Sequence, residues 1–371
     1  MFTVRKKCIF CDLKLRDTYF KHDYEIPVAC YSTDNPCYNK IPYNILTCPQ
    51  CKTIQTKYLG DLNEIYKVNH ADSTGTLMKG LHNKVKDIII SYENSNININ
   101  NIVEIGAAKG VLSDLILDYN IVSKYYIIEP NYFGKKRENK HIINDYFENV
   151  KFEDYKDCNT LLISHVFEHF YNPKEILSVI QKNKYIENFI LVWPDLEYYK
   201  DNRVYHVLNT EHTFYVDNNF IKDLLNNSGF SLINKESYKG HSVIFTFKRE
   251  QNLQLKELKN TNYNIDKYYN GIINLLPSIN KFIETNNNKK IAIWPCSVHT
   301  QFLLMFLKNL KIINLIDNSP NKINKYIYGY NIKCLNFKKY VNDNNFAVIL
   351  NGGVFNNEIK SYITNKNVIY I

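Results

Sequence analysis

The chain has 371 residues, which is too long for one ordinary core, so we expect two or three domains. Its formal net charge of +9 comes from 46 Lys and Arg against 37 Asp and Glu, spread along the whole sequence. Because no concentrated basic stripe with interleaved aromatic residues occurs, the charge argues against nucleic acid as a partner. No apolar run approaches a membrane span, and Met1 to Cys8 contains no apolar export signal, so we expect a cytoplasmic protein without a membrane partner.

Two pairs of cysteines with CxxC spacing lie near the start of the chain, Cys8 with Cys11 and Cys48 with Cys51. Each pair places two thiolates on one tight turn, where both can reach a single ion at about 2.3 Å. Four thiolates leave no open coordination position, which favours a structural metal. Zinc is the default ion, and a rubredoxin-type iron or four unliganded thiols are the alternatives. We expect residues 1–62 to form a zinc-binding domain.

Residues 63–250 are expected to form one α/β domain. Apolar positions at helical spacing predict a helix from about Ser73 to Tyr92. From Ile102 onward strands alternate with helices, which predicts a doubly wound, parallel, Rossmann-like sheet. The expected strands cover 102–105, 125–128, 141–144, 161–164, 189–192 and 242–247, and the expected helices cover 111–119 and 220–227.

The last part of the chain, residues 251–371, predicts a second and smaller α/β domain. A helical connector is expected at about 251–285. Four apolar strands follow it, at 291–294, 312–316, 346–350 and 367–370. This series is typical of a half-sized nucleotide fold.

A glycine-bearing turn follows the first strand of the larger domain. Gly106 and Gly110 allow close backbone approach and a tight entry into the next helix. Their spacing, with Glu104 before them, favours an S-adenosylmethionine site over a dinucleotide site, because no diphosphate has to be cradled. Glu104 could then face the amino acid end of that cofactor.

The next two strands end in acidic residues as well. Glu129, followed by Pro130, could accept hydrogen bonds from both ribose hydroxyls. Asp145 and Tyr146 could take the adenine amine and cover its ring. Three acidic strand ends in this order indicate an S-adenosylmethionine site, and a generic α/β fold with acidic strand ends is the alternative.

Histidines stand in two further positions where ligands are expected. Ser164 and His165 end the fourth strand and should line the cofactor, and His169 should face the substrate. Further on, Glu211 precedes His212; a histidine beside a glutamate can act as a general base, with its pKa raised by the carboxylate. The alternatives are packed histidines and a Glu–His pair that only braces a loop.

Taken in order, the two CxxC pairs, Glu104-Ile105-Gly106, Val166-Phe167-Glu168-His169 and Thr210-Glu211-His212 resemble the deoxysugar C-methyltransferases. That family acts on nucleotide-linked 4-keto sugars. The resemblance implies a zinc-binding head, a central class I methyltransferase domain that binds S-adenosylmethionine, and a C-terminal nucleotide-fold domain. The tail segments Asp317 to Lys322 and Tyr328-Gly329 also resemble that family.

The resemblance also implies roles for single residues. His212 would remove a proton from the carbon next to the keto group, with Glu211 as its partner and His169 as a further active-site histidine. Tyr66, His70 and Asn209 fall where that family contacts substrate. Asn209 replaces a tyrosine usual in the family, and Trp294 to Ser297 replaces a glycine-rich turn.

We therefore expect an S-adenosylmethionine-dependent methyltransferase of a nucleotide sugar, with a structural zinc ion, as a monomer or homodimer. Three other functions remain open at this point. They are a sugar O-methyltransferase on the same scaffold, a zinc-ribbon protein that binds or methylates RNA, and an inactive scaffold.

Overall fold

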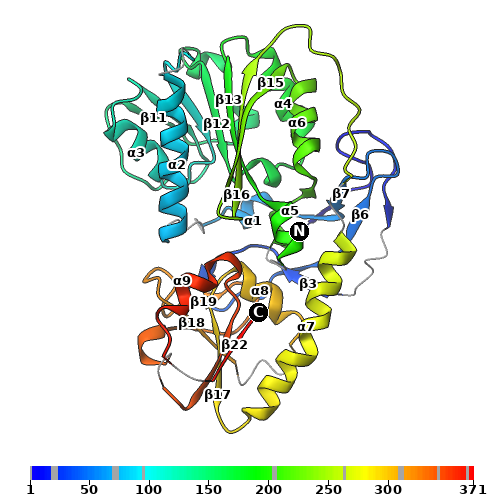
Figure 1. Ribbon diagram of the computed structural model, residues 1–371, viewed down its shortest axis with the longest axis vertical. Helices are drawn as coiled ribbons and strands as arrows, with labels where there is room; N and C mark the ends of the chain where they lie inside the picture. Colours follow the sequence, from blue (N-terminus) through cyan, green and yellow to red (C-terminus); the bar gives the residue numbers. More distant parts are fainter. Residues whose placement is uncertain are drawn as a thin grey trace.

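The computed structural model describes residues 2–17, 24–68, 75–93, 97–202, 207–261, 265–307, 313–340, 343–364 and 367–371. Figure 1 shows a large sheet with helices in its upper part, a smaller sheet at the bottom, and the N-terminal strands between them. His70, one of the expected substrate residues, lies outside the described residues.

The large sheet has seven strands in the order β11-β10-β9-β12-β13-β16-β15. The first five of these are parallel, and β16 is antiparallel to both of its neighbours. In chain order this is the 3-2-1-4-5-7-6 arrangement of the class I methyltransferase fold, which confirms the predicted fold class. The strands are β9 (Ile102–Ile105), β10 (Tyr125–Ile128), β11 (Lys140–Ile143), β12 (Thr160–Ser164), β13 (Asn188–Pro194), β15 (Phe230–Tyr238) and β16 (Ser242–Arg249).

Helices cover both faces of this sheet, which explains the uninterrupted apolar runs of its central strands. Side chains of β9 alternate between two cores: Ile102 packs on one face, and Val103 and Ile105 pack on the other. The first face carries α2 (Thr76–Glu93) and α3 (Val111–Asp118); the second carries α4 (Pro173–Lys182), α5 (Leu196–Asp201) and α6 (Asn218–Asn227). The strand order reverses between β9 and β12, which is where ligands bind in doubly wound sheets.

Several elements differ from the sequence-based expectations, among them a fifth strand of the tail, β20 (Cys334–Asn336), which was not expected. Strand β15 was not expected, because about half of its residues are polar. It is the edge strand of the sheet, and along most of it exposed side chains alternate with half-buried ones. The expected helix at 251–285 is formed only as α7 (Ile265–Thr285). Residues 251–261 instead run along α6 without helical structure, where Asn226 and Asn227 donate side-chain hydrogen bonds to the carbonyls of Gln254 and Lys256, each at 2.8 Å.

The N-terminal head consists of short strands around the cysteine turns. It contains β1 (Phe2–Val4), β2 (Arg16–Asp17), β3 (Tyr24–Pro27), β4 (Ser32–Thr33), β5 (Lys40–Tyr43), β6 (Ile45–Thr47), β7 (Ile54–Thr56), β8 (Tyr58–Gly60) and α1 (Leu62–Ile65). All nine cysteines of the chain lie among the described residues, and none of them forms a disulfide. In the part of the chain that the structure describes, no helix has both the length and the apolar character to cross a bilayer.

The C-terminal sheet has five parallel strands in the order β20-β18-β17-β21-β22. Helices α7 and α8 (Val298–Leu304) pack on one of its faces, and α9 (Asn356–Lys360) packs on the other. The strands are β17 (Lys290–Trp294), β18 (Ile313–Asp317), β20 (Cys334–Asn336), β21 (Phe346–Leu350) and β22 (Val368–Tyr370). This is the small nucleotide-type fold expected for the tail.

The head is paired by backbone hydrogen bonds to both sheet-containing parts. Its β7 pairs with β14 (Phe214–Tyr215), which belongs to the loop before α6, and its β4 pairs with β19 (Tyr326–Ile327) of the tail. Gln301 adds a side-chain link, donating to the carbonyls of Ala29 and Tyr328 at 3.1 and 2.9 Å.

Buried histidines lie where the two sheet-containing parts meet. The ring of Phe355 lies 5.8 Å from that of His241 and 6.5 Å from that of His299, between centroids. Burial lowers the pKa of His299 to about 3, below the ordinary value of 6.5. Such a histidine stays neutral in the folded chain while the unfolded chain takes up a proton, so stability is lost as the pH falls below about 6.5.

We therefore predict that His299→Asn weakens the acid sensitivity of the fold. One such histidine costs on the order of 2 kcal/mol between pH 7 and pH 5. Urea unfolding at both pH values should show a smaller loss of unfolding free energy for His299→Asn than for the wild type. The exposed His141 supplies the control, since His141→Asn should lose as much as the wild type. Equal losses for all three proteins would contradict the prediction.

Candidate functional site

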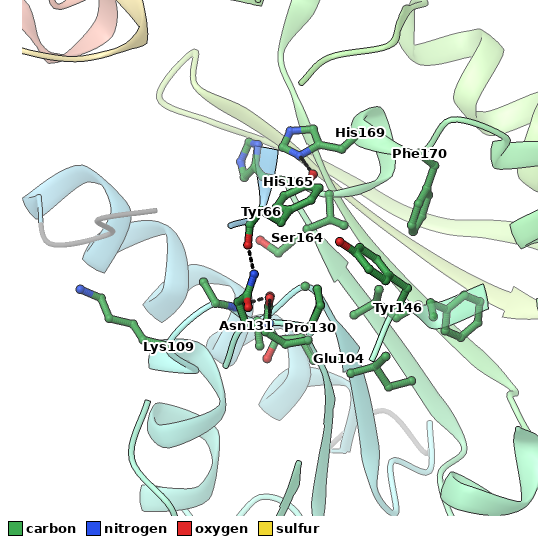
Figure 2. Close-up of a pocket in the computed structure, with 18 of the residues that line it drawn as sticks. Tyr66, Glu104, Lys109, Pro130, Asn131, Tyr146, Ser164, His165, His169 and Phe170 are labelled. Atoms are coloured by element: carbon green, nitrogen blue, oxygen red, sulfur yellow. Dashed lines mark hydrogen bonds between the residues drawn. The ribbon is translucent and has the colours of Figure 1, made fainter. Parts of the chain in front are cut away.

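A cavity of about 370 Å³ lies at the carboxyl ends of β9, β10 and β12, at the point where the strand order reverses. Figure 2 shows side chains from several elements that point into it. All the expected cofactor residues except Gly110 line it, together with parts of α1, α2 and the loop before α6. The lining includes Tyr66, His82, Glu104, Gly106, Glu129, Pro130, Asp145, Tyr146, Ser164, His165, His169 and Glu211.

The glycine turn is built so that larger residues do not fit. Gly106 has a φ of +76°, and a Cβ there would overlap the side chain of Val166. Its N–H donates to the carbonyl of Ile128 at 2.9 Å, which fixes the turn against the end of β10. Gly110, at φ +64°, is the left-handed residue that begins α3. The backbone therefore approaches the cavity at a position that only glycine occupies without strain.

Glu104 lies at the bottom of the cavity and is 4% exposed. Burial raises its pKa to about 7, although the hydroxyl of Tyr125 donates a hydrogen bond to it at 2.8 Å. A buried carboxyl group on the floor of a cavity favours a cationic ligand group, because such a group would restore its charge.

Glu129 holds the two turns that follow β9 and β10. Its carboxylate accepts the N–H of Ala108 and that of Asn131, both at 3.0 Å. Asp145 accepts the N–H of Tyr146 through Oδ1 at 2.7 Å. Both acids line the cavity, so the structure brings the three predicted strand-end carboxylates to one side of it.

Tyr66 closes the cavity from the side of the N-terminal head. Figure 2 shows its hydroxyl beside His169 and its backbone beside Asn131. The Tyr66 hydroxyl lies 3.3 Å from His169 Nδ1, and the Asn131 amide donates to the Tyr66 carbonyl. Tyr66 and Tyr146 meet edge to face, with ring centroids 6.5 Å apart. The two tyrosines and His169 thus form one wall.

His165 has an unusual backbone conformation for a side chain of its size. Its φ is +52°, a conformation that costs energy and is concentrated at functional sites. The ring Nε2 lies 2.8 Å from the Ser242 hydroxyl, and Nδ1 lies 3.6 Å from Glu168 Oε1. Burial lowers the pKa of His165 to about 4, so it is a neutral lining residue near pH 7.

The loop from 207 to 216 carries the expected catalytic pair. Asn209 braces it, because its side-chain oxygen accepts the N–H groups of Glu211 and His212 at 2.8 and 2.9 Å. Glu211 lines the cavity, whereas Asn209 and His212 are not among its lining residues. Asn209, which was expected to contact the substrate, thus stabilises the conformation of this loop.

The expected Glu211–His212 pair is replaced by two other neighbouring pairs, in which Glu211 lies near His169 and Glu168 lies near His212. Glu211 accepts the N–H of Cys30 at 3.2 Å and lies 3.9 Å from His169 Nδ1. His212 Nε2 lies 4.0 Å from Glu168 Oε1. The expected rise in the pKa of His212 is wrong, since burial holds that pKa well below its ordinary value.

Glu168 and Arg5 are residues near the site to which the sequence analysis gave no role. Glu168 belongs to the motif Val166-Phe167-Glu168-His169. Its spacing of three residues from His165 is the sequence feature that indicates a contact between the two side chains. Arg5 is 6% exposed and donates to the carbonyls of Thr213 and Tyr171 at 2.6 and 2.9 Å. A single arginine before a cysteine pair gives no sequence signal for that task.

The four head cysteines form one cluster, with their sulfur atoms within 4.8 Å of one another. The two turns are built alike: the N–H of Cys8 donates to the carbonyl of Leu13, and that of Cys48 donates to the carbonyl of Thr53. Cys8 and Cys51 Sγ lie 3.6 Å apart, near the roughly 3.8 Å of a tetrahedral site with 2.3 Å zinc–sulfur bonds.

Hydrogen-bond donors surround the sulfur atoms of this cluster. The Gln55 amide donates to Cys8 Sγ at 3.1 Å, and the N–H of Phe10 donates to the same sulfur at 3.4 Å. Such donors stabilise thiolates, which is the form that binds a metal. The cluster therefore fits zinc, and it fits four unliganded thiols less well.

No protein-family model and no curated protein matches the sequence. Among solved structures, the chain is similar to 1,6-didemethyltoxoflavin-N1-methyltransferase of Burkholderia thailandensis with bound S-adenosylhomocysteine. The identity is 10%, over 46% of this chain and 78% of that one, with a TM-score of 0.36. It is also similar to the N-methyltransferase NodS of Bradyrhizobium japonicum, at 8% identity over 46% and 96% of the two chains, with a TM-score of 0.33.

A third similar structure is the N-terminal domain of EvdMO1 with bound S-adenosylhomocysteine. The identity is 13%, over 45% of this chain and 81% of that one, with a TM-score of 0.32. At these identities and scores, the function has to be argued from the residues of the site.

We predict that Cys48→Ser removes the metal and destabilises the fold. A structural metal couples its binding to folding, so the melting temperature should fall by more than about 5 °C. Zinc analysis of the purified protein and thermal unfolding measure both effects. Cys37→Ser, in the head but outside the cluster, should keep its zinc and melt as the wild type does. A Cys48→Ser protein with unchanged melting, or a wild type without stoichiometric zinc or iron, would show that the cluster is not a metal site.

Proposed function

We propose that this chain is an S-adenosylmethionine-dependent methyltransferase whose acceptor is a nucleotide-linked keto sugar. The observation that carries the proposal is the cavity at the reversal of the strand order. It is bordered by a glycine turn and by carboxyl groups from three adjacent parallel strands, Glu104, Glu129 and Asp145. Its volume of about 370 Å³ is in the range of small-molecule sites.

Each of these groups suits one part of the proposed cofactor. Glu104 would face the ammonium group of its amino acid end, which explains a buried acid on the cavity floor. Glu129 would accept the ribose hydroxyls, with Pro130 beside it. Asp145 and Tyr146 would hold the adenine ring. Ser164 and His165 complete the wall at the end of β12.

The acceptor would lie on the side of His169 and Glu211, which also line the cavity. In the proposed reaction a base takes the proton from the carbon next to the keto group. The resulting enolate carbon then forms a bond to the cofactor methyl, the methyl–sulfur bond breaks, and S-adenosylhomocysteine leaves. We assign the base to His212 and the support of the histidines to Glu211, with His169 and Tyr66 next to the substrate.

The zinc-binding head takes no part in the methyl transfer under this proposal. A site of four cysteines offers no open position for a substrate, so its metal is structural. Chemistry at the sulfonium needs no metal, because the positive sulfur already makes the methyl group electrophilic. We propose a monomer or homodimer that does not bind nucleic acid.

The first test concerns His212. His212→Asn should lower the rate of methyl transfer by about 10²–10⁴-fold, because loss of a general base typically costs that much. Affinity for S-adenosylhomocysteine, measured by calorimetry, should stay nearly unchanged, since the cofactor contacts lie on other strands. Glu211→Gln should cost less, because the imidazole itself remains. Retention of most of the turnover by His212→Asn would remove His212 from the mechanism and leave His169 as the candidate.

The second test concerns the substrate. Nucleotide sugars with and without a 4-keto group are incubated with the protein and S-adenosylmethionine, and products are identified by mass spectrometry. We expect a gain of one methyl group on the keto forms alone. Methylation of fully reduced sugars would assign an O-methyltransferase instead. Methylation of RNA alone, or absence of cofactor binding, would overturn the proposed function.

A further inference from the structure

Three side chains outside the cysteine cluster offer their donor atoms to one point. Glu168, His169 and His212 each present a carboxylate oxygen or ring nitrogen, and these atoms lie within 4.8 Å of one another. Glu168 and His169 come from the 3₁₀ turn Phe167–His169 after β12, and His212 comes from the loop before α6. The rings of His169 and His212 have centroids 5.1 Å apart and are tilted by 38°.

Glu168 is the unusual member of this group. Its side chain is 1% exposed, and neither carboxylate oxygen has a hydrogen-bond partner within the described residues. The ring nitrogens that face Oε1, those of His165 and His212, stand at 3.6 and 4.0 Å, too far for direct hydrogen bonds. A buried carboxyl group to which no other residue donates a hydrogen bond is costly, so a cation bound between it and the imidazoles would stabilise the site.

We infer that Glu168, His169 and His212 bind a divalent transition-metal ion, at a second site separate from the four-cysteine cluster. Two imidazoles and one carboxylate form a ligand set typical of zinc and related ions that keep an open position. Bonds to such an ion measure about 2.0–2.2 Å. The three donor atoms would therefore move towards the ion by a few tenths of an ångström when it binds.

The surroundings of His169 support a ligand role. Its Nδ1 lies 3.3 Å from the Tyr66 hydroxyl and 3.9 Å from a Glu211 oxygen. Ligand histidines commonly pair their other ring nitrogen with a carboxylate or another polar group, which orients the ring. His169 could therefore bind the ion through Nε2. Because His169 also lines the cavity, a bound ion would lie beside the acceptor side of that cavity.

This site goes beyond the proposed function and would change one assignment within it. As a ligand, His212 could not accept the substrate proton. The ion would polarise the keto oxygen, and the proton would pass to the Glu211 carboxylate, while the methyl group would move as described above. The reaction and its products would stay the same, so methyl transfer without a second metal would refute only this inference.

The experiment measures metal binding apart from activity. Zinc-loaded protein is dialysed against Co²⁺, and both metals are counted per chain. We expect the wild type to keep one zinc ion and to bind one cobalt ion with the weak visible absorption of nitrogen and oxygen ligands. A strong sulfur charge-transfer band would instead reveal exchange at the cysteines. Glu168→Gln and His212→Asn should each weaken cobalt binding by at least about 10-fold, since even indirect changes at metal sites cost that much.

Matched controls separate ligand loss from general damage. The exposed residues Glu187 and His141 allow the same chemical changes elsewhere, and Glu187→Gln and His141→Asn should bind cobalt as the wild type does. Melting temperatures show whether each variant is folded. A wild type that binds no cobalt beyond exchange at the cysteines overturns the inference. Undiminished binding by folded Glu168→Gln and His212→Asn overturns it as well.

Discussion

The pairing of β14 with β7 is the interaction on which the arrangement of the site depends. Phe214 and Tyr215 form a short antiparallel ladder with Gln55 and Ile54, directly after the second cysteine turn. The loop that carries Glu211 and His212 therefore runs between the N-terminal head and its own domain, where the N–H of Thr213 donates to the carbonyl of Glu168 at 2.9 Å. Arg5 ties the same loop to the domain by donating to the carbonyls of Thr213 and Tyr171. A metal bound in the head would thus act on the site by stabilising one edge of it, without contacting any reactant.

The opposite edge of the site is set by the parallel sheet. Its central strands run parallel, so their carboxyl ends lie at the same edge of the sheet. The glycine turn and the three acidic residues that end these strands therefore lie close together. The histidines then accumulate where sheet, head and loop meet, in a region from which solvent is largely excluded. Burial lowers the pKa of His165 and of His212, and it raises the pKa of Glu168 to about 7. Such a region favours neutral imidazoles. It also favours the protonated form of Glu168 unless a cation lies nearby.

Local sequence patterns were sufficient to predict the fold class and most of the strand-end residues that line the cavity. The strand ending at Ile105, the glycines at 106 and 110, and Glu129 all lie within one βαβ unit, where spacing alone determines geometry. The part of the cavity wall around Glu211 could not be predicted in the same way. Cys30, Glu168 and Glu211 come from three distant segments, so their contacts depend on how the head is docked. The edge strand β15 escaped prediction because a half-exposed strand carries a half-polar sequence.

The ladder between β4 and β19 sets an order on the assembly of the chain. Thr33 pairs with Tyr326, and the N–H of Gly329 donates to the carbonyl of Cys37 at 2.9 Å. During synthesis the head leaves the ribosome before the tail, so this strand of it stays unpaired until the segment around Tyr326 has been made. Contacts of such long range slow folding and leave an open strand edge in the meantime. The cysteine turns need no distant partner, so an early-bound zinc ion would keep the waiting head compact.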